Sequence, residues 1–140
     1  MDQRAPGHNW IAIVKQNGTA EFGRAFAPNP TLDASVLNGP CVGVQAIAAF
    51  FAATSGGMYE TIVFTHETTS GRKTYREWQG TAFGKQVSGT TILTRNHEGL
   101  IEHIQLYHSP LQVVVEFSRE LAKHLQGKVD QALLNEERDP

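Results

Sequence analysis

The sequence predicts an α+β fold in which helices lie on one side of an antiparallel sheet. Apolar residues recur at helical spacing in the first half of the chain and again near its end. Between these regions lie four consecutive segments rich in β-branched and aromatic residues, a composition typical of strands. Turn-forming residues separate the four segments, so we expect them to pair as a meander.

The N-terminal region predicts two short helices. Residues 10–15 are mostly apolar and are followed by Asn17-Gly18, a common helix stop. Thr19 can cap a second helix, because its hydroxyl can accept a backbone hydrogen bond, and Pro28 is expected to end that helix.

A short strand and a third helix are expected next. Residues 31–37 alternate well enough to predict a strand. Residues 42–54 carry apolar side chains at helical spacing, and Ser55-Gly56-Gly57 ends that pattern. The helix is therefore expected to precede the meander directly.

The second half of the chain predicts the meander and a closing helix. Ser109-Pro110 is typical of a helix start, and an apolar stripe continues from it to about residue 126. The four strands of the meander are expected over residues 59–68, 73–83, 87–94 and 100–108.

Length and composition indicate one domain and exclude several classes of function. The 140 residues are expected to form a single unit over 1–140, with a core over 8–126 and a charged, fraying tail over 127–140. The formal charge is −2, and the basic residues are scattered among acids, so no nucleic-acid partner is expected. No apolar run approaches the roughly 20 residues of a membrane helix, so no membrane partner is expected either.

The single cysteine and the opening residues bear on location. Cys41 cannot form an internal disulfide and is expected to be a small buried side chain rather than a reactive thiol. The first seven residues contain no apolar signal core, so a cytoplasmic location is expected.

Four segments of the chain carry a family resemblance: Asn17-Gly18, residues 26–51, residues 94–101 and residues 106–111. In order and in spacing they resemble the SnoaL-like and ketosteroid-isomerase-like branch of the nuclear transport factor 2-like superfamily. The resemblance covers nearly the whole chain. It implies a cone-shaped, curved sheet wrapped around N-terminal helices, an apolar cavity inside the cone, and homodimers formed through the sheet.

The same resemblance disfavours steroid isomerisation. That reaction needs a carboxylate base and a buried pair of neutral hydrogen-bond donors. At the corresponding positions this chain has Ala34 for the base, and Ile11 and Thr91 for the donors. Asp33 precedes the base position by one residue, and successive strand residues point to opposite faces.

The pairing of two strands predicts which side chains line the cone. If Gly84-Lys85 forms a two-residue hairpin turn, Trp78 pairs with Thr91 and both lie on one face. A turn one residue longer would put Glu77 on that face instead of Trp78. The resemblance places Ile104, Leu106 and His108 on the same face and aligns Ile11 with a donor position of the family. The side chains expected to line the pocket are therefore Ile11, Trp78, Thr91, Ile104, Leu106 and His108.

His108 is the expected proton-transfer group, because histidine can act as an acid or a base near neutral pH, and Asp33 is the second choice. The competing interpretations are a structural histidine at a strand end and a solvated carboxylate. No metal site is expected, since no histidine pair shows the HExxH spacing. No glycine-rich phosphate loop is present either, and no cofactor is expected.

Two functional hypotheses follow. The first is a SnoaL-like small-molecule protein that binds or converts a hydrophobic carbonyl-type compound by acid/base chemistry without a cofactor. The second is a non-catalytic module for dimerisation or peptide interaction. Tyr75 and Tyr107 are expected on the outer sheet face, where a second copy of the chain would cover them in a homodimer.

Overall fold

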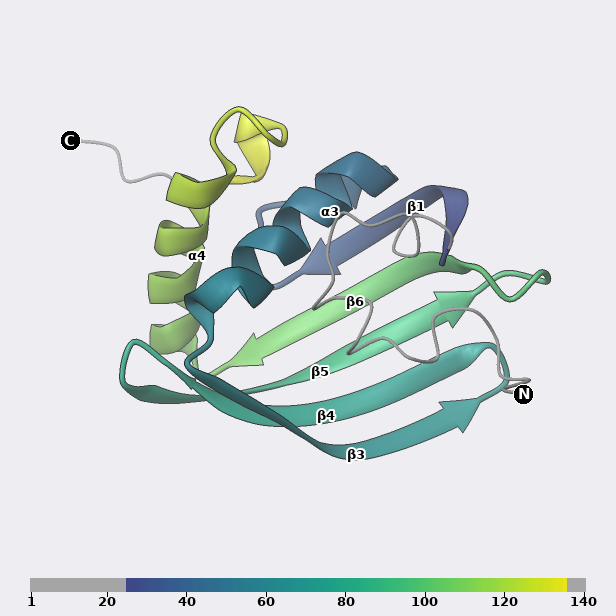
Figure 1. The fold of residues 1–140 in the computed structure, drawn as a ribbon, viewed down its shortest axis with the longest axis horizontal. Helices are drawn as coiled ribbons and strands as arrows, with labels where there is room; N and C mark the ends of the chain where they lie inside the picture. The colour runs from purple at the N-terminus through teal and green to yellow at the C-terminus, as the bar shows by residue number, and fades with distance from the viewer. Residues whose placement is uncertain (1–24, 136–140) are drawn as a thin grey trace.

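The computed structural model describes residues 25–135, which form a curved sheet with helices against it (Figure 1). The helices expected before residue 25, and Ile11 with them, lie outside the described residues. The elements are β1 (Phe26–Ala34), β2 (Cys41–Val42), α3 (Val44–Ala53), a π-helical turn (Thr54–Met58), β3 (Thr61–Ser70), β4 (Lys73–Ala82), β5 (Lys85–Arg95), β6 (Ile101–Ser109), α4 (Leu111–Leu125) and a 3₁₀ turn (Gln131–Leu133).

The sheet has six strands in the order β2-β1-β6-β5-β4-β3. The expected meander is present, since β3, β4, β5 and β6 pair antiparallel. The sheet is nevertheless mixed and not purely antiparallel, because β1 runs parallel to β6. A parallel neighbour requires a long crossover, and α3 with the meander supplies it.

The first strand begins earlier than the sequence predicts. Phe26 was expected in a helix ending at Pro28, but β1 already begins at Phe26. Two prolines are tolerated inside the strand because its register with β6 shifts between Phe26 and Thr31. No regular ladder hydrogen bonds are needed from the prolines there.

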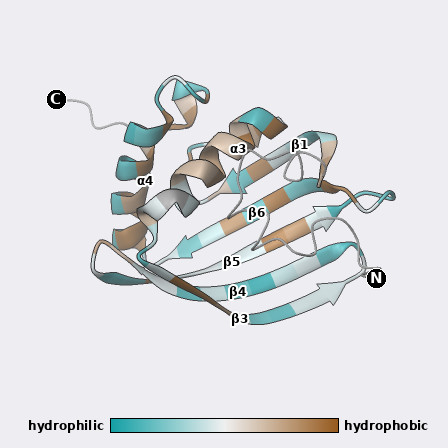
Figure 2. Cartoon of the chain, in the orientation of Figure 1, coloured by the Kyte–Doolittle hydropathy of each residue, from teal (hydrophilic) through white to brown (hydrophobic). Residues whose placement is uncertain are grey.

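The sheet bends around a core that lies on its concave face. The helix α3 packs on β1 and β2, and α4 packs on β5 and β6 at one end (Figure 1). Inner residues such as Leu32, Leu93 and Ile104 are fully buried. Figure 2 shows hydrophobic segments in α3, β5, β6 and the first part of β3, whereas β4 is largely hydrophilic. None of the described helices is both long and apolar enough to span a membrane.

The hairpin between β4 and β5 differs from the expected one by a small shift. Its turn is Phe83-Gly84, with φ angles of 56° and 70°, and Trp78 pairs with Gly89 rather than with Thr91. A bulky residue with a positive φ is uncommon, so the sequence pointed to the next two residues instead. The shift equals two positions along β5, so Trp78 and Thr91 still share the concave face.

The C-terminal residues extend the packed core. Fraying was expected after residue 126, but Leu134 is buried. The backbone N–H of Asn38 donates a hydrogen bond to the Leu133 carbonyl at 2.8 Å. The side chain of Asn38 also donates to the Leu134 carbonyl, at 3.2 Å. These contacts dock residues 131–134 beside the end of β1.

We predict that Gly89→Ala destabilises the protein by about 1–3 kcal/mol, the usual cost of overpacking a core. A Cβ atom at Gly89 would overlap the indole ring of Trp78. The control is Gly39→Ala, where the nearest obstacle is a Leu133 methyl group at 3.5 Å. Urea unfolding compares the two variants, and equal free energies of unfolding would contradict the prediction.

Candidate functional site

A group of aromatic and polar side chains meets on the concave face where the meander reaches α4. We call Tyr59, Trp78, Thr91, His108 and Phe117 the aromatic cluster. The ring of His108 lies 5.1 Å from that of Trp78, 5.9 Å from that of Tyr59 and 5.0 Å from that of Phe117, measured between centroids. The cluster therefore joins five parts of the chain: the turn before β3, the strands β4, β5 and β6, and the helix α4.

The wide turn at the end of α3 positions Tyr59. The last helical turn opens into a π-helical segment, and Gly57 has a φ of 129°, which favours glycine. The chain then enters β3 with the Tyr59 ring parallel to the His108 ring, at an interplanar angle of 3°. The Tyr59 hydroxyl and Nε2 of His108 are 2.5 Å apart, a short hydrogen bond.

Trp78 forms the wall of the cluster on β4. Its side chain is 2% exposed and lies over Gly89 of β5, where any larger residue would collide with it. The indole Nε1–H donates to Oγ1 of Thr91 at 3.2 Å. A buried indole usually finds such a partner, so this bond satisfies the only polar group of the tryptophan.

His108 is held inside the cluster as a neutral side chain. The residue is 7% exposed, and its backbone N–H donates to Oγ of Ser35 at 2.9 Å. Burial lowers its pKa to about 3, because an apolar environment disfavours the charged imidazolium. Its Nδ1 atom is buried and has no hydrogen-bond partner among residues 25–135.

Tyr59 is held neutral by the same environment. Burial raises the pKa of its hydroxyl well above the ordinary value of 10, since the phenolate would be poorly solvated. The two groups thus form a neutral, hydrogen-bonded pair at neutral pH. Such a pair can donate or accept hydrogen bonds in an apolar setting but is unsuited to binding a charged group.

The predicted pocket residues do not all border the same hollow. Ile104 and Leu106 are buried on the concave face of β6, as expected. Trp78 and His108 both border a hollow of about 370 Å³, but its remaining lining comes mainly from the convex face. That hollow is lined by Thr65, Glu77, Trp78, Gln79, Ser88, Gly89, Thr90, Tyr107, His108 and Ser109.

Asp33, the second-choice base, lies on the opposite face of the sheet from His108. Its neighbours Leu32 and Ala34 are buried on the concave side, so Asp33 points to the convex face. There its carboxylate lies 3.2 Å from Nε2 of His103, whose Nδ1 is 2.6 Å from Oγ1 of Thr31. Asp33 and His108 therefore cannot act on the same ligand atom.

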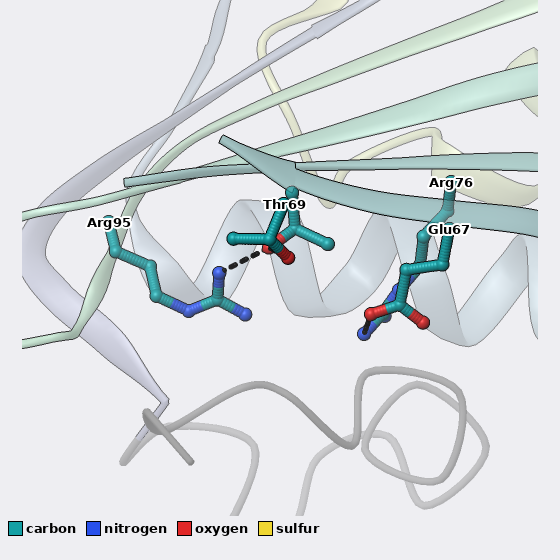
Figure 3. Close-up of polar contacts among 5 residues, drawn as sticks. Glu67, Thr69, Arg76 and Arg95 are labelled. Carbon is teal, nitrogen blue, oxygen red and sulfur yellow. Dashed lines mark hydrogen bonds and ion pairs between the residues drawn. The ribbon is translucent and has the colours of Figure 1, made fainter. Parts of the chain in front are cut away.

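A second polar group lies on the concave face and was not predicted from the sequence. We call it the arginine group: Glu67, Thr69, Thr74, Arg76 and Arg95. Nη2 of Arg76 is 3.4 Å from Oε1 of Glu67, and Nη1 of Arg95 donates to Oγ1 of Thr74 at 2.8 Å. The labelled side chains project from the same side of the sheet (Figure 3). A bulge between Phe64 and His66 turns Glu67 and Thr69 inward.

One signal in the sequence could have revealed the arginines. Arg76 precedes Trp78 by two residues, and Arg95 follows Thr91 by four, so the face assignment of Trp78 and Thr91 applies to them too. Both arginines are almost fully buried, at 3% and 7% exposure.

Other candidate chemistry has little support in the described residues. Cys41 is fully buried, and burial raises its pKa to about 11, so its thiol stays protonated. Within residues 25–135, no three histidine, cysteine, aspartate or glutamate side chains cluster in a way that could hold a metal ion.

Comparison with known proteins identifies the fold but no family by sequence. No protein-family model matches the chain, and no curated protein is detectably similar to it in sequence. The steroid delta-isomerase from Pseudomonas aeruginosa superimposes with a TM-score of 0.75 at 13% identity, over 84% of this chain and 87% of that one.

Two further crystal structures agree with this result. A protein named as a SnoaL-like polyketide cyclase from Jannaschia sp. CCS1 has a TM-score of 0.60 at 16% identity, covering 75% of this chain and 82% of its own. An NTF2-like protein from Cytophaga hutchinsonii gives 0.58 at 12% identity, covering 74% and 87%. The expected resemblance to the SnoaL-like and ketosteroid-isomerase-like fold is thereby confirmed.

We predict that His108 makes the fold less stable in acid. Its folded pKa of about 3 lies below the ordinary 6.5, so the unfolded chain binds the proton more readily between these values. The stabilisation is complete above pH 6.5 and is lost as pH falls toward 3, at up to about 1.4 kcal/mol per pH unit.

The variant His108→Gln keeps a hydrogen-bonding side chain but cannot be protonated in this range. Its free energy of unfolding should therefore fall less steeply than that of the wild type between pH 6.5 and 5, measured by urea unfolding. The exposed His97 provides the control, as His97→Gln. Identical slopes for wild type and His108→Gln would refute the assignment.

Proposed function

We propose that this protein is a SnoaL-like small-molecule protein that binds a hydrophobic carbonyl-type compound on its concave face. The observation that carries the proposal is the Tyr59–His108 hydrogen bond inside an otherwise aromatic wall. Ligand sites are commonly apolar surfaces with a few well-placed polar groups, and this arrangement has that character.

The hydrogen bond assigns a role to each partner. When the Tyr59 hydroxyl donates to Nε2, the imidazole proton resides on Nδ1. That N–H is buried and has no partner among residues 25–135, so it is the donor offered to a carbonyl oxygen. A neutral imidazole can polarise a carbonyl group by donating this hydrogen bond, and it does not need to carry a positive charge to do so.

The arrangement supports binding of a carbonyl compound better than its chemical conversion. A general base works best when its pKa lies near the working pH, and the pKa of His108 is about 3. Asp33, the second expected base, faces the other side of the sheet. Steroid isomerisation stays disfavoured, because Ala34 and Thr91 stand where the resemblance requires a carboxylate base and an acidic donor.

The test compares a ketone with a hydrocarbon of similar shape, 2-acetylnaphthalene and 2-ethylnaphthalene, by isothermal titration. We expect the wild type to bind the ketone more tightly, by roughly two- to tenfold, the worth of one neutral hydrogen bond. His108→Phe should remove this preference, and Tyr59→Phe should reduce it.

The matched control is Tyr107→Phe, which removes a hydroxyl group on the convex face. In the wild type this hydroxyl accepts a hydrogen bond from the side-chain Nε2–H of Gln105. This variant should keep the wild-type preference. Equal affinity of the wild type for ketone and hydrocarbon would exclude His108 as the donor.

The convex face supports a second function, assembly of two copies. Tyr75 and Tyr107 are 37% and 41% exposed there, and Val63 is 62% exposed. A sheet face with several exposed apolar side chains is typical of an interaction surface. We propose a homodimer through this face; it does not compete with the ligand site, which lies on the other side.

We predict that the wild type is a dimer at micromolar concentration and that Tyr107→Lys shifts it to monomer, because a lysine would bury its charge in the interface. Light scattering after size exclusion measures this. Leu111→Lys, at a 77% exposed position on α4, is the control and should stay dimeric. A monomeric wild type would rule out the assembly.

A further inference from the structure

Three polar side chains meet on the convex face of the sheet, where β1 runs beside β6. Thr31 and Asp33 lie on either side of the buried Leu32, so both point away from the core. His103 is the partner of Thr31 in the parallel register of β1 and β6. The imidazole therefore lies beside two side chains of the neighbouring strand, and it contacts both. We call Thr31, His103 and Asp33 the convex triad.

The contacts of the convex triad run in the order hydroxyl, imidazole, carboxylate. Oγ1 of Thr31 is 2.6 Å from Nδ1 of His103, and Nε2 of His103 is 3.2 Å from Oδ2 of Asp33. A carboxylate only accepts hydrogen bonds, so a neutral His103 donates to it from Nε2. The lone pair of Nδ1 then faces the hydroxyl of Thr31 and accepts its hydrogen bond. The carboxylate thereby selects the tautomer in which the imidazole can act as a base toward the hydroxyl.

Solvent reaches the convex triad. The side chains of His103 and Asp33 are 30% and 46% exposed, and Thr31 is half-buried. Val42 of β2 is the antiparallel partner of Thr31 and is 58% exposed, so it offers an apolar surface beside the hydroxyl. A carbonyl compound can therefore approach Thr31 from outside, with a short apolar chain against Val42.

We infer that the convex triad is a hydrolytic site, separate from the concave ligand site, at which Thr31 is the nucleophile toward activated carboxylic esters. Oγ1 of Thr31 attacks the ester carbonyl carbon, and its proton passes to Nδ1 of His103. The tetrahedral intermediate then breaks its bond to the leaving oxygen, which takes up that proton and departs as an alcohol or phenol. The carboxylate of Asp33 stabilises the transient imidazolium. Water attacks the acyl group on Thr31 with Nδ1 again as the base, so ester and water give acid and alcohol.

A pair of residues on β3 provides a matched comparison within the same chain. Oγ1 of Thr68 is 2.9 Å from Nε2 of His66, and both residues are exposed. In the described part of the chain no carboxylate forms an ion pair with His66, so no such partner selects its tautomer. Thr68 thus has a histidine neighbour without the third member, and it should not be acylated.

The test uses p-nitrophenyl acetate at pH 7.5, with release of p-nitrophenol followed by absorbance and the acetyl group located by mass spectrometry of peptides. We expect the wild type to carry acetyl on Thr31 and not on Thr68. Thr31→Val keeps the shape of the side chain without its hydroxyl and should remove most of the release. His103→Gln should slow acetylation of Thr31 by about 10²-fold or more, the usual worth of a positioned base. His66→Gln is the matched control and should leave the rate unchanged.

Asp33 acts through His103, so it is a positioning residue and needs a test of its own. Asp33→Asn should slow acetylation of Thr31, because an amide can donate to Nε2 and so place the imidazole proton on Nδ1, toward the hydroxyl. Asp33→Glu restores a carboxylate that only accepts, and it should recover at least part of the rate. A merely structural role predicts the reverse order, because asparagine has the shape of aspartate.

The outcomes are independent of ketone binding at the concave face and of the dimer. If two copies cover the convex face, the monomeric Tyr107→Lys variant exposes the convex triad, so this variant is assayed beside the wild type. Absence of acetyl on Thr31 in both proteins overturns the inference, and so does acetylation that His103→Gln leaves unchanged. Equal acetylation of Thr31 and Thr68 shows ordinary surface reactivity and overturns it as well.

Discussion

The contact of Trp78 with Gly89 is the constraint on which the arrangement of the concave face depends. The indole covers the backbone of β5 because Gly89 has no side chain, and this fixes which face each residue of β4 and β5 presents. Thr91 then receives the indole proton, and the ring edge meets His108 and Tyr59. A slip by one residue would turn the whole inner set outward, so one glycine helps to hold the register.

The concave face is divided into two electrostatic regions. Near α4, apolar rings surround a neutral tyrosine and histidine, and burial keeps both uncharged. Toward the other end of the strands lie Arg76, Arg95 and Glu67, with Nη2 of Arg76 3.4 Å from Oε1 of Glu67. Burying groups that can become neutral costs less than burying arginine, whose pKa is too high for it to lose its proton. The two regions therefore differ in both polarity and charge.

Much of the fold could be predicted from the sequence, because alternation and turn residues determine strand order in a meander. The assignment of Trp78, Thr91, Ile104 and Leu106 to one face came from period-two alternation and tolerated a two-residue error in the hairpin. The parallel pairing of β1 with β6 could not be predicted in this way, because it depends on contacts between distant segments. Tyr59 was missed because a π-helical turn, which has no sequence signature, aims it inward. The convex position of Asp33 followed from its parity, because Leu32 and Ala34 on either side of it face the core.

The bulge at Thr65 shows how easily such a surface could change during evolution. One additional residue in β3 inverts the faces of everything that follows it in the strand, so Glu67 and Thr69 look inward only because of that insertion. Deleting a single codon there would return the strand to regular pairing and move the Glu67 carboxylate from the concave face to the convex face. Relatives that differ by one residue at this point would therefore share the same backbone path and yet carry a different charge on the concave face.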